Sequence, residues 1–154
     1  MKKLLVSFIA LVVIMFLSGY SNLPSNVKKV KNVYKAELAS KMLSSYGKTK
    51  AKGHAVFRFS KDGKSLSYQL YVYDIDSVSM SHIHHGPFGK EGPIAVWLYK
   101  GKITGKFNGL LSKGTITDKD INLDTLRTWM NAGDTYVLVH TQKFPNGEIG
   151  GKIH

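Results

Sequence analysis

The sequence has 154 residues, of which 43% are hydrophobic and 11% aromatic, enough apolar material for one folded domain preceded by a short targeting segment. It contains no cysteine, which excludes disulfide frameworks, zinc–thiolate sites, cysteine nucleophiles and cysteine-ligated iron–sulfur clusters. The formal net charge is +12 at pH 7, and a surface of that charge attracts polyanions such as nucleic acid, anionic lipid or acidic wall polymers.

Lysine carries almost all of the positive charge, because the only arginines are Arg58 and Arg127. Proteins that read nucleic-acid grooves or clamp phosphates depend on the rigid fork of arginine. We therefore expect a diffuse attraction to anionic cell-envelope polymers or a lipid surface, and no specific nucleic-acid recognition. The sequence does not identify a protein partner.

The N-terminus has the features of an export signal. Lys2 and Lys3 precede an apolar run from Leu4 to Leu17, which is short for a bilayer span of about 20 residues but suits the core of a secretory signal. We predict a signal peptide over residues 1–21, and hence a secreted or envelope-associated protein.

The end of this leader, "LSGY", resembles the Leu-small-Gly-Cys motif of bacterial lipoproteins, with Tyr20 in the place of the lipidated cysteine. Without the thiol there is nothing to acylate, so we favour a plain export signal. Membrane anchoring would require an uncleaved leader or a native cysteine at position 20. Residues 22–32 are polar and lysine-rich and are predicted to form a basic tether.

The predicted domain occupies residues 33–154, and its first half favours strands. Residues 33–43, "VYKAELASKML", alternate as a first strand does, although one or two helical turns also fit. Residues 53–74, "GHAVFRFSKDGKSLSYQLYVYD", predict a hairpin that turns at Asp62 and Gly63. Its two apolar faces consist of Ala55, Phe57 and Phe59 on one strand and Leu66, Tyr68, Leu70 and Val72 on the other.

Further short strands follow. Residues 81–86, "SHIHHG", indicate the end of a strand, and residues 93–99, "PIAVWLY", indicate a buried strand. Residues 101–117, "GKITGKFNGLLSKGTIT", are expected to form short strands interrupted by glycines.

One helix and a closing hairpin complete the chain. Residues 120–133, "DINLDTLRTWMNAG", predict a helix with Asp118 or Asp120 near its start and Gly133 after its end. Residues 135–141 and 147–154 then pair across the turn "QKFPNG". Many short strands, glycine-rich turns and a single short helix indicate an all-β antiparallel sandwich or barrel.

Three stretches together resemble one family. "SHIHHGPFGKEGPIAVWLY" is similar to the His-Ile-His-Gly, Gly-Pro and hydrophobic-strand signature of the CHRD (chordin) domain. "GTITDKDI" with "LRTWMNAGDTYVLVHTQKFPNGEIGGKI" resembles its C-terminal signature, and "YKAEL" with "GHAVFRFSKDGKSLSYQLYV" fits its N-terminal strands. The resemblance extends from about Val33 to Ile153, with the motifs in order.

The resemblance implies an antiparallel immunoglobulin-like or superoxide-dismutase-like β-sandwich in an exported protein. It implies no settled biochemical activity. In animal chordin the domain belongs to an extracellular ligand-binding protein, and that use does not transfer to this chain.

The histidines are the most distinctive candidates for function. His82 and His84 lie two residues apart, so on a strand they project to the same face. If Ile83 faces the core, and the strand that contains His140 is the neighbour, then His82, His84 and His140 converge. Three imidazoles suit copper or zinc and leave a position for water or an outside ligand. His85 is a candidate fourth ligand or a solvent-facing residue, and Glu148 a candidate acceptor that orients an imidazole.

The pattern His-x-His on one strand with a histidine on another resembles the copper side of Cu,Zn superoxide dismutase. However, the sequence has no bridging histidine with a zinc-ligand loop, no disulfide and no guiding arginine near the closing strand. We therefore do not predict dismutase activity, and we assign no catalytic residue.

We predict an exported, non-enzymatic binding module at the cell envelope that binds a transition metal, if any, through the three histidines. The first alternative is a metal-dependent redox or hydrolytic enzyme. The second is a structural or adhesion module in which the imidazoles are only hydrogen-bonded to neighbouring groups.

Overall fold

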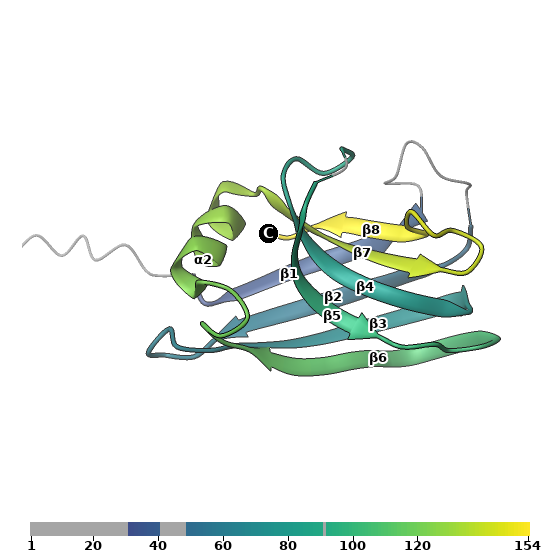
Figure 1. Ribbon diagram of the computed structural model, residues 1–154, viewed down its shortest axis with the longest axis horizontal. Helices are drawn as coiled ribbons and strands as arrows, with labels where there is room; N and C mark the ends of the chain where they lie inside the picture. The colour runs from purple at the N-terminus through teal and green to yellow at the C-terminus, as the bar shows by residue number, and fades with distance from the viewer. Residues whose placement is uncertain (1–30, 41–48, 91) are drawn as a thin grey trace, which may run out of the picture. The chain divides into compact units, whose positions relative to one another are not determined.

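The protein is described by a computed structural model, which covers residues 31–40, 49–90 and 92–154 (Figure 1). The predicted leader, most of the predicted tether and positions 41–43 lie outside the described residues. The elements, in chain order, are β1 (Val33–Ala39), β2 (Lys52–Phe59), β3 (Leu66–Asp76), β4 (Val78–His85), β5 (Ile94–Lys100), β6 (Lys106–Ile116), α2 (Leu123–Ala132), β7 (Thr135–Thr141) and β8 (Ile149–Lys152). The predicted all-β antiparallel architecture with one short helix is confirmed.

The eight strands form one antiparallel sheet in the order β5-β4-β7-β8-β1-β2-β3-β6. The sheet folds over into two layers, β5-β4-β7-β8 and β1-β2-β3-β6, which lie face to face (Figure 1). At the fold, β8 joins β1 through the pair Ala39–Gly150 and through reciprocal backbone hydrogen bonds of 2.8 and 2.9 Å between Lys35 and His154. At the opposite side, the Tyr68 hydroxyl on β3 donates to the Leu98 carbonyl on β5 at 2.8 Å. The result is a nearly closed sandwich.

The core lies between the layers because the strands alternate as the sequence predicts. In the predicted hairpin, Ala55, Phe57 and Leu70 are almost fully buried, and the two strands pair in register from Lys52–Tyr73 to Phe59–Leu66. The ambiguous first segment is a strand over the described residues, since Tyr34, Ala36 and Leu38 alternate into the core. A helix would place Ala36 on the opposite side from Tyr34 and Leu38.

Helix α2 covers one end of the sandwich (Figure 1). Its buried residues Leu123, Leu126 and Met130 lie on one helical face. Asn122 caps the helix by accepting a 2.8 Å hydrogen bond from the Thr125 amide. Gly133 ends it in the left-handed conformation with φ of 73°, as the sequence predicts.

Two predictions about strands need correction. β5 is buried only in part: Val96 and Leu98 belong to the core, but the strand forms an end of the sheet and leaves Ile94 and Trp97 45% and 44% exposed. Residues 106–116 form one continuous strand and not several short ones. Its Gly114 does not interrupt the strand, because the missing side chain leaves space for the Tyr68 ring of the neighbouring strand.

At the junction of the two layers, Gly151 of β8 pairs with Val137 on β7 and has no space for a side chain. A Cβ at this position would overlap the Glu37 carbonyl oxygen of β1. We expect Gly151→Ala to lower the free energy of unfolding by about 2 kcal/mol or more, since backbone must move to admit the methyl group. Urea denaturation measures this loss. Lys152→Ala at the exposed neighbouring position should change stability by less than about 0.5 kcal/mol, and equal effects would contradict the assignment.

Candidate metal centre

His82, His84 and His140 lie on the outer face of the layer that contains β4 and β7. These strands are neighbours, with His82 opposite Leu138 and His84 opposite Tyr136. The residues of opposite parity, Ile83, Val137 and Val139, are fully buried in the main core. The three histidines therefore project away from that core on a common side, as the alternation in the sequence predicts.

The structure brings the three imidazoles together. One potential ligand nitrogen from each ring lies within 4.8 Å of the others. His82 Nδ1 and His140 Nε2 are 3.2 Å apart. Although they are on an outer face, the side chains are only 1%, 6% and 6% exposed for His82, His84 and His140.

Two loops cover the group and orient two of its rings. His84 Nδ1 lies 2.9 Å from the Gly92 carbonyl oxygen in the β4–β5 loop. His140 Nδ1 lies 2.9 Å from the Pro145 carbonyl oxygen in the β7–β8 loop. A carbonyl oxygen can only accept, so each Nδ1 carries the proton and each neutral ring keeps its lone pair on Nε2.

Tyr136 supports His84 and the loop that orients it. Its ring stacks on His84 with centroids 5.0 Å apart and planes 7° apart. Its hydroxyl donates to the Lys90 carbonyl at 2.9 Å and accepts from the Gly92 amide at 2.9 Å. Sequence reasoning did not select Tyr136 for the site, although its parity with His140 on the same strand is the signal that could have found it.

Trp97 borders the group from the neighbouring strand β5. Its ring centroid is 4.1 Å from that of His82, with the planes at 85°. Lys100 Nζ lies 4.1 Å from the same indole ring. Trp97 is half-exposed, so its ring contacts both His82 and solvent on this side of the group.

The two auxiliary candidates lie elsewhere. His85 stacks on Trp129 of α2, with centroids 3.8 Å apart and planes 14° apart, because its parity on β4 is opposite to that of the other two histidines. Glu148 is buried and accepts a 2.8 Å hydrogen bond from the Thr141 hydroxyl. The structure brings neither into the group, and backbone carbonyls take the orienting role that was predicted for Glu148.

The environment disfavours the protonated forms of His82 and His140. Burial lowers the pKa of His82 from 6.5 to about 4, with smaller contributions from His140, His84 and Lys100. Burial also lowers the pKa of His140, against the opposing effect of its bond to Pro145. Unprotonated imidazoles are the form that binds metals.

These features define an all-β sandwich with a buried three-histidine group on the outer face of one sheet layer. The CHRD domain family matches residues 34–153, and the chain belongs to that family. No curated protein and no solved structure matches the chain. In the described part of the chain, no helix is both long and apolar enough to cross a membrane.

The lowered pKa of His82 predicts a pH-dependent stability for the metal-free protein. Between about pH 6.5 and 4 the unfolded chain binds a proton at His82 that the folded protein excludes. The free energy of unfolding should therefore be highest above about pH 6.5 and fall by up to about 3 kcal/mol toward pH 4. Urea denaturation in the presence of a chelator at pH 7, 5.5 and 4.5 measures the slope.

His82→Gln should reduce this slope and leave the part that His140 contributes. His54→Gln, on the other layer and outside the three-histidine group, is the matched control. A slope that is the same in all three proteins would contradict the assignment to His82.

Proposed function

We propose that the protein is an exported, non-enzymatic binding module of the cell envelope that binds a transition metal, copper or zinc, through His82, His84 and His140. The observation that supports this most directly is the approach of the three ligand nitrogens to within 4.8 Å of one another in a buried setting. Membership of the CHRD family supports a binding module.

The geometry of the group fits a metal. Zinc binds imidazole nitrogen at about 2.0–2.1 Å in a tetrahedral arrangement, which places two such nitrogens roughly 3.3 Å apart. The separation of His82 Nδ1 and His140 Nε2, 3.2 Å, is close to that value. The longest separation of 4.8 Å requires one ring to move inward when a metal binds.

Without a metal, the ring nitrogens cannot all be satisfied. His140 Nδ1 donates to Pro145, so its Nε2 can only accept, and His82 Nδ1 must supply the proton between them. His82 Nε2 is then a buried acceptor for which the described residues provide no donor. Leaving such a group unsatisfied costs about 1–3 kcal/mol. A cation between His82 Nδ1 and His140 Nε2 would accommodate both lone pairs, and the proton of His82 would then reside on its Nε2.

The three imidazole ligands indicate which metals the site would bind. Imidazole suits zinc and copper, and among divalent ions copper binds such sites most tightly. Three protein ligands leave one position for water or an outside group. A bound metal would supply Lewis acidity or, if it is copper, redox chemistry.

The hydroxyl groups beside the histidines in sequence do not form a nucleophile–base pair. The Ser81 hydroxyl donates to the Leu138 carbonyl at 2.8 Å, and the Thr141 hydroxyl donates to Glu148 at 2.8 Å. Both are bound on the opposite face of their strands from the imidazoles. This arrangement favours a binding role over hydrolysis by a serine or threonine nucleophile.

Metal titration tests the site. We expect metal-stripped protein to bind one Cu²⁺ or Zn²⁺ per chain by calorimetry, and His82→Ala/His84→Ala to weaken binding by more than about 100-fold. The variant His54→Ala/His154→Ala removes the same number of histidines from outside the group and should bind normally. Cu²⁺ should also quench the fluorescence of Trp97, which lies beside His82. The variant Trp129→Phe makes this measurement specific, because Trp97 is then the only tryptophan in the sequence.

Absent binding, or binding that the first double variant retains, would contradict the metal site. The bonds of His84 and His140 to the two loop carbonyls would then favour the alternative structural module, in which the imidazoles hold the loops against the sheet.

The predicted export supports association with anionic envelope polymers, as does the net charge, which is +12 for the whole chain and +10 once Lys2 and Lys3 are removed with the predicted leader. Such attraction weakens as the screening length falls from about 10 Å at 0.1 M salt to about 3 Å at 1 M. We expect washing of the envelope fraction with about 1 M NaCl to release the protein. Retention that is insensitive to salt would contradict electrostatic association.

A further inference from the structure

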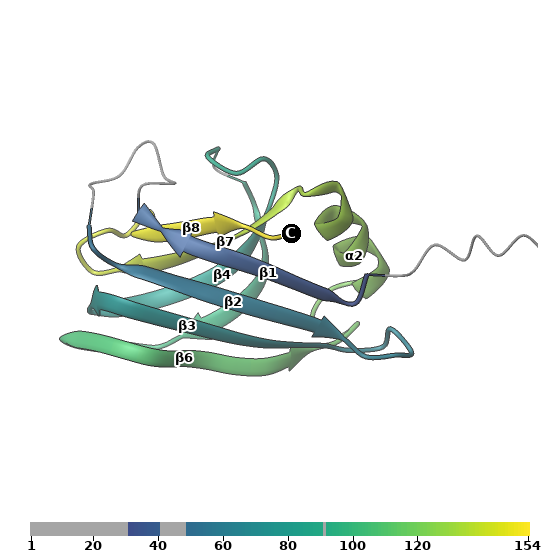
Figure 2. The same ribbon diagram turned by 180° about the vertical axis from the view of Figure 1, so that it is seen from behind.

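The outer face of the β1-β2-β3-β6 layer is open and carries both cations and aromatic rings. Figure 2 shows these four strands in front, and no described segment lies across them. We call this surface the basic–aromatic face; its defining residues are Lys35, Lys52, His54, Arg58, Tyr71, Tyr73 and Lys113. It belongs to the layer opposite the three histidines.

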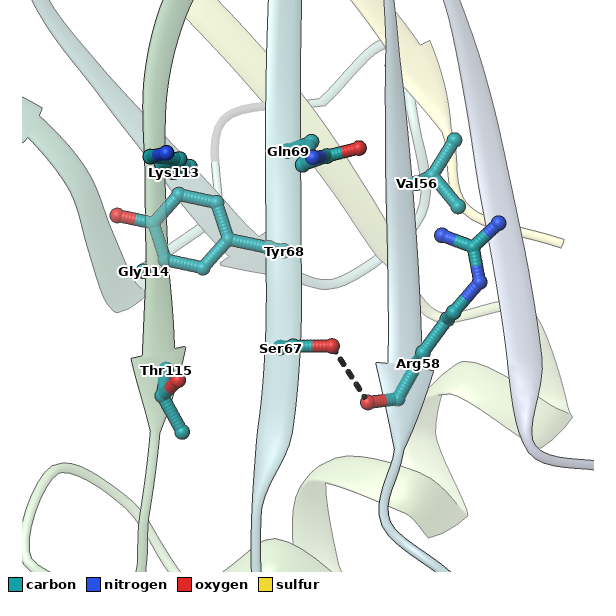
Figure 3. A pocket seen from close by; sticks show the side chains of 8 residues that line it. All are labelled: Val56, Arg58, Ser67, Tyr68, Gln69, Lys113, Gly114 and Thr115. Carbon is teal, nitrogen blue, oxygen red and sulfur yellow. Dashed lines mark hydrogen bonds between the residues drawn. The ribbon is translucent and has the colours of Figure 1, made fainter.

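Cations occupy neighbouring cross-strand rows at one end of this face. Lys35, Val56, Gln69 and Lys113 form one row across the four strands. In the next row Arg58 pairs with Ser67, whose hydroxyl donates to the Arg58 carbonyl at 3.2 Å. A hollow of about 450 Å³ lies over these rows, with the Arg58 side chain extending toward Val56 (Figure 3).

Aromatic rings occupy the other end. His54 stacks against Tyr71 with centroids 4.9 Å apart and planes 14° apart, and against Tyr73 at 6.1 Å and 25°. All three rings are half-buried. A second hollow of about 420 Å³ is lined by His54, Tyr73 and Lys52 among others.

The basic–aromatic face carries mostly positive charge. In the cross-strand rows that begin at the β1 residues Val33 to Ala39, Glu37 is the only carboxylate among the described residues. The same rows contain four cationic side chains: Lys35, Lys52, Arg58 and Lys113. The two exposed large apolar side chains of this layer, Val33 and Leu110, lie on its outermost strands β1 and β6. They form no continuous patch for insertion into a bilayer.

We propose that the basic–aromatic face binds an acidic polysaccharide in an extended conformation. The cations fit the carboxylate or phosphate groups of such a chain, the ring faces fit the C–H surfaces of sugars, and Gln69, Ser67 and Thr115 offer partners for its hydroxyls. At about 3.3 Å per residue, the distance along β2 from Lys52 to Arg58 is roughly 20 Å, room for several sugar units. This inference deepens the proposed association with envelope polymers by assigning it to one face.

The test is binding of the full chain to polygalacturonate, measured by calorimetry in a chelating buffer that keeps the three-histidine group out of the result. We expect Lys35→Gln/Lys113→Gln to weaken binding about tenfold and to reduce its salt dependence. Lys102→Gln/Lys143→Gln removes the same charge from exposed loops off this face, and should weaken binding less than about threefold. Tyr71→Ser, at unchanged charge, should weaken binding by roughly three- to tenfold.

Thermal melting checks that each variant is folded. If Tyr71→Ser does not fold, the comparison of the two lysine variants still tests the inference. Equal losses in both lysine variants would overturn the assignment to this face while leaving a diffuse electrostatic association intact. No binding to polygalacturonate would overturn the inference together with the envelope association. Tighter binding to duplex DNA or to anionic phosphatidylglycerol vesicles than to polygalacturonate would also overturn the inference, by assigning the face to another class of partner.

Discussion

The antiparallel pairing of β4 with β7 is the constraint on which both the fold and the candidate site depend. Because strand residues alternate, the same register that buries Ile83, Val137 and Val139 in the core must project the intervening residues outward. A shift of one residue would place imidazoles in the core and valines outside, at a prohibitive cost. The position of the histidines is therefore tied to the stability of the sandwich.

Backbone carbonyls then define which nitrogens the group presents. The bonds from His84 and His140 to the β4–β5 and β7–β8 loops hold the protons on Nδ1 and leave Nε2 for coordination. Burial in addition lowers the pKa of His82 and His140. Because each loop orients one ring, disturbing either loop should change the orientation of that ring.

The two layers of the sandwich divide the chemistry of the protein. The layer with β4 and β7 carries a small, buried group of imidazoles that suits one ion. The layer with β1, β2, β3 and β6 carries a wide, open and basic surface that suits an extended polyanion. The core between them separates the two, so that substitutions on one surface should leave the binding properties of the other unchanged.

Local patterns predicted much of this architecture. Alternation identified the 53–74 hairpin and the common face of His82, His84 and His140, and Gly133 correctly indicated the end of the helix. The errors arose where an element's environment is set by distant residues. β5 has an apolar sequence but lies at an end of the sheet, and Gly114 continues a strand because Tyr68 of another strand fills the space above it.

The sequence by itself determined the fold class and the parity of the histidines, because both follow from the period of side chains along a strand. Only the tertiary structure decided that β4 and β7 are neighbours and that the carbonyls of Gly92 and Pro145 orient the rings. It also decided that His85 packs on Trp129 and Glu148 binds Thr141, away from the group. These features depend on strand order and loop paths, which link residues far apart in the chain and leave no local periodic signal.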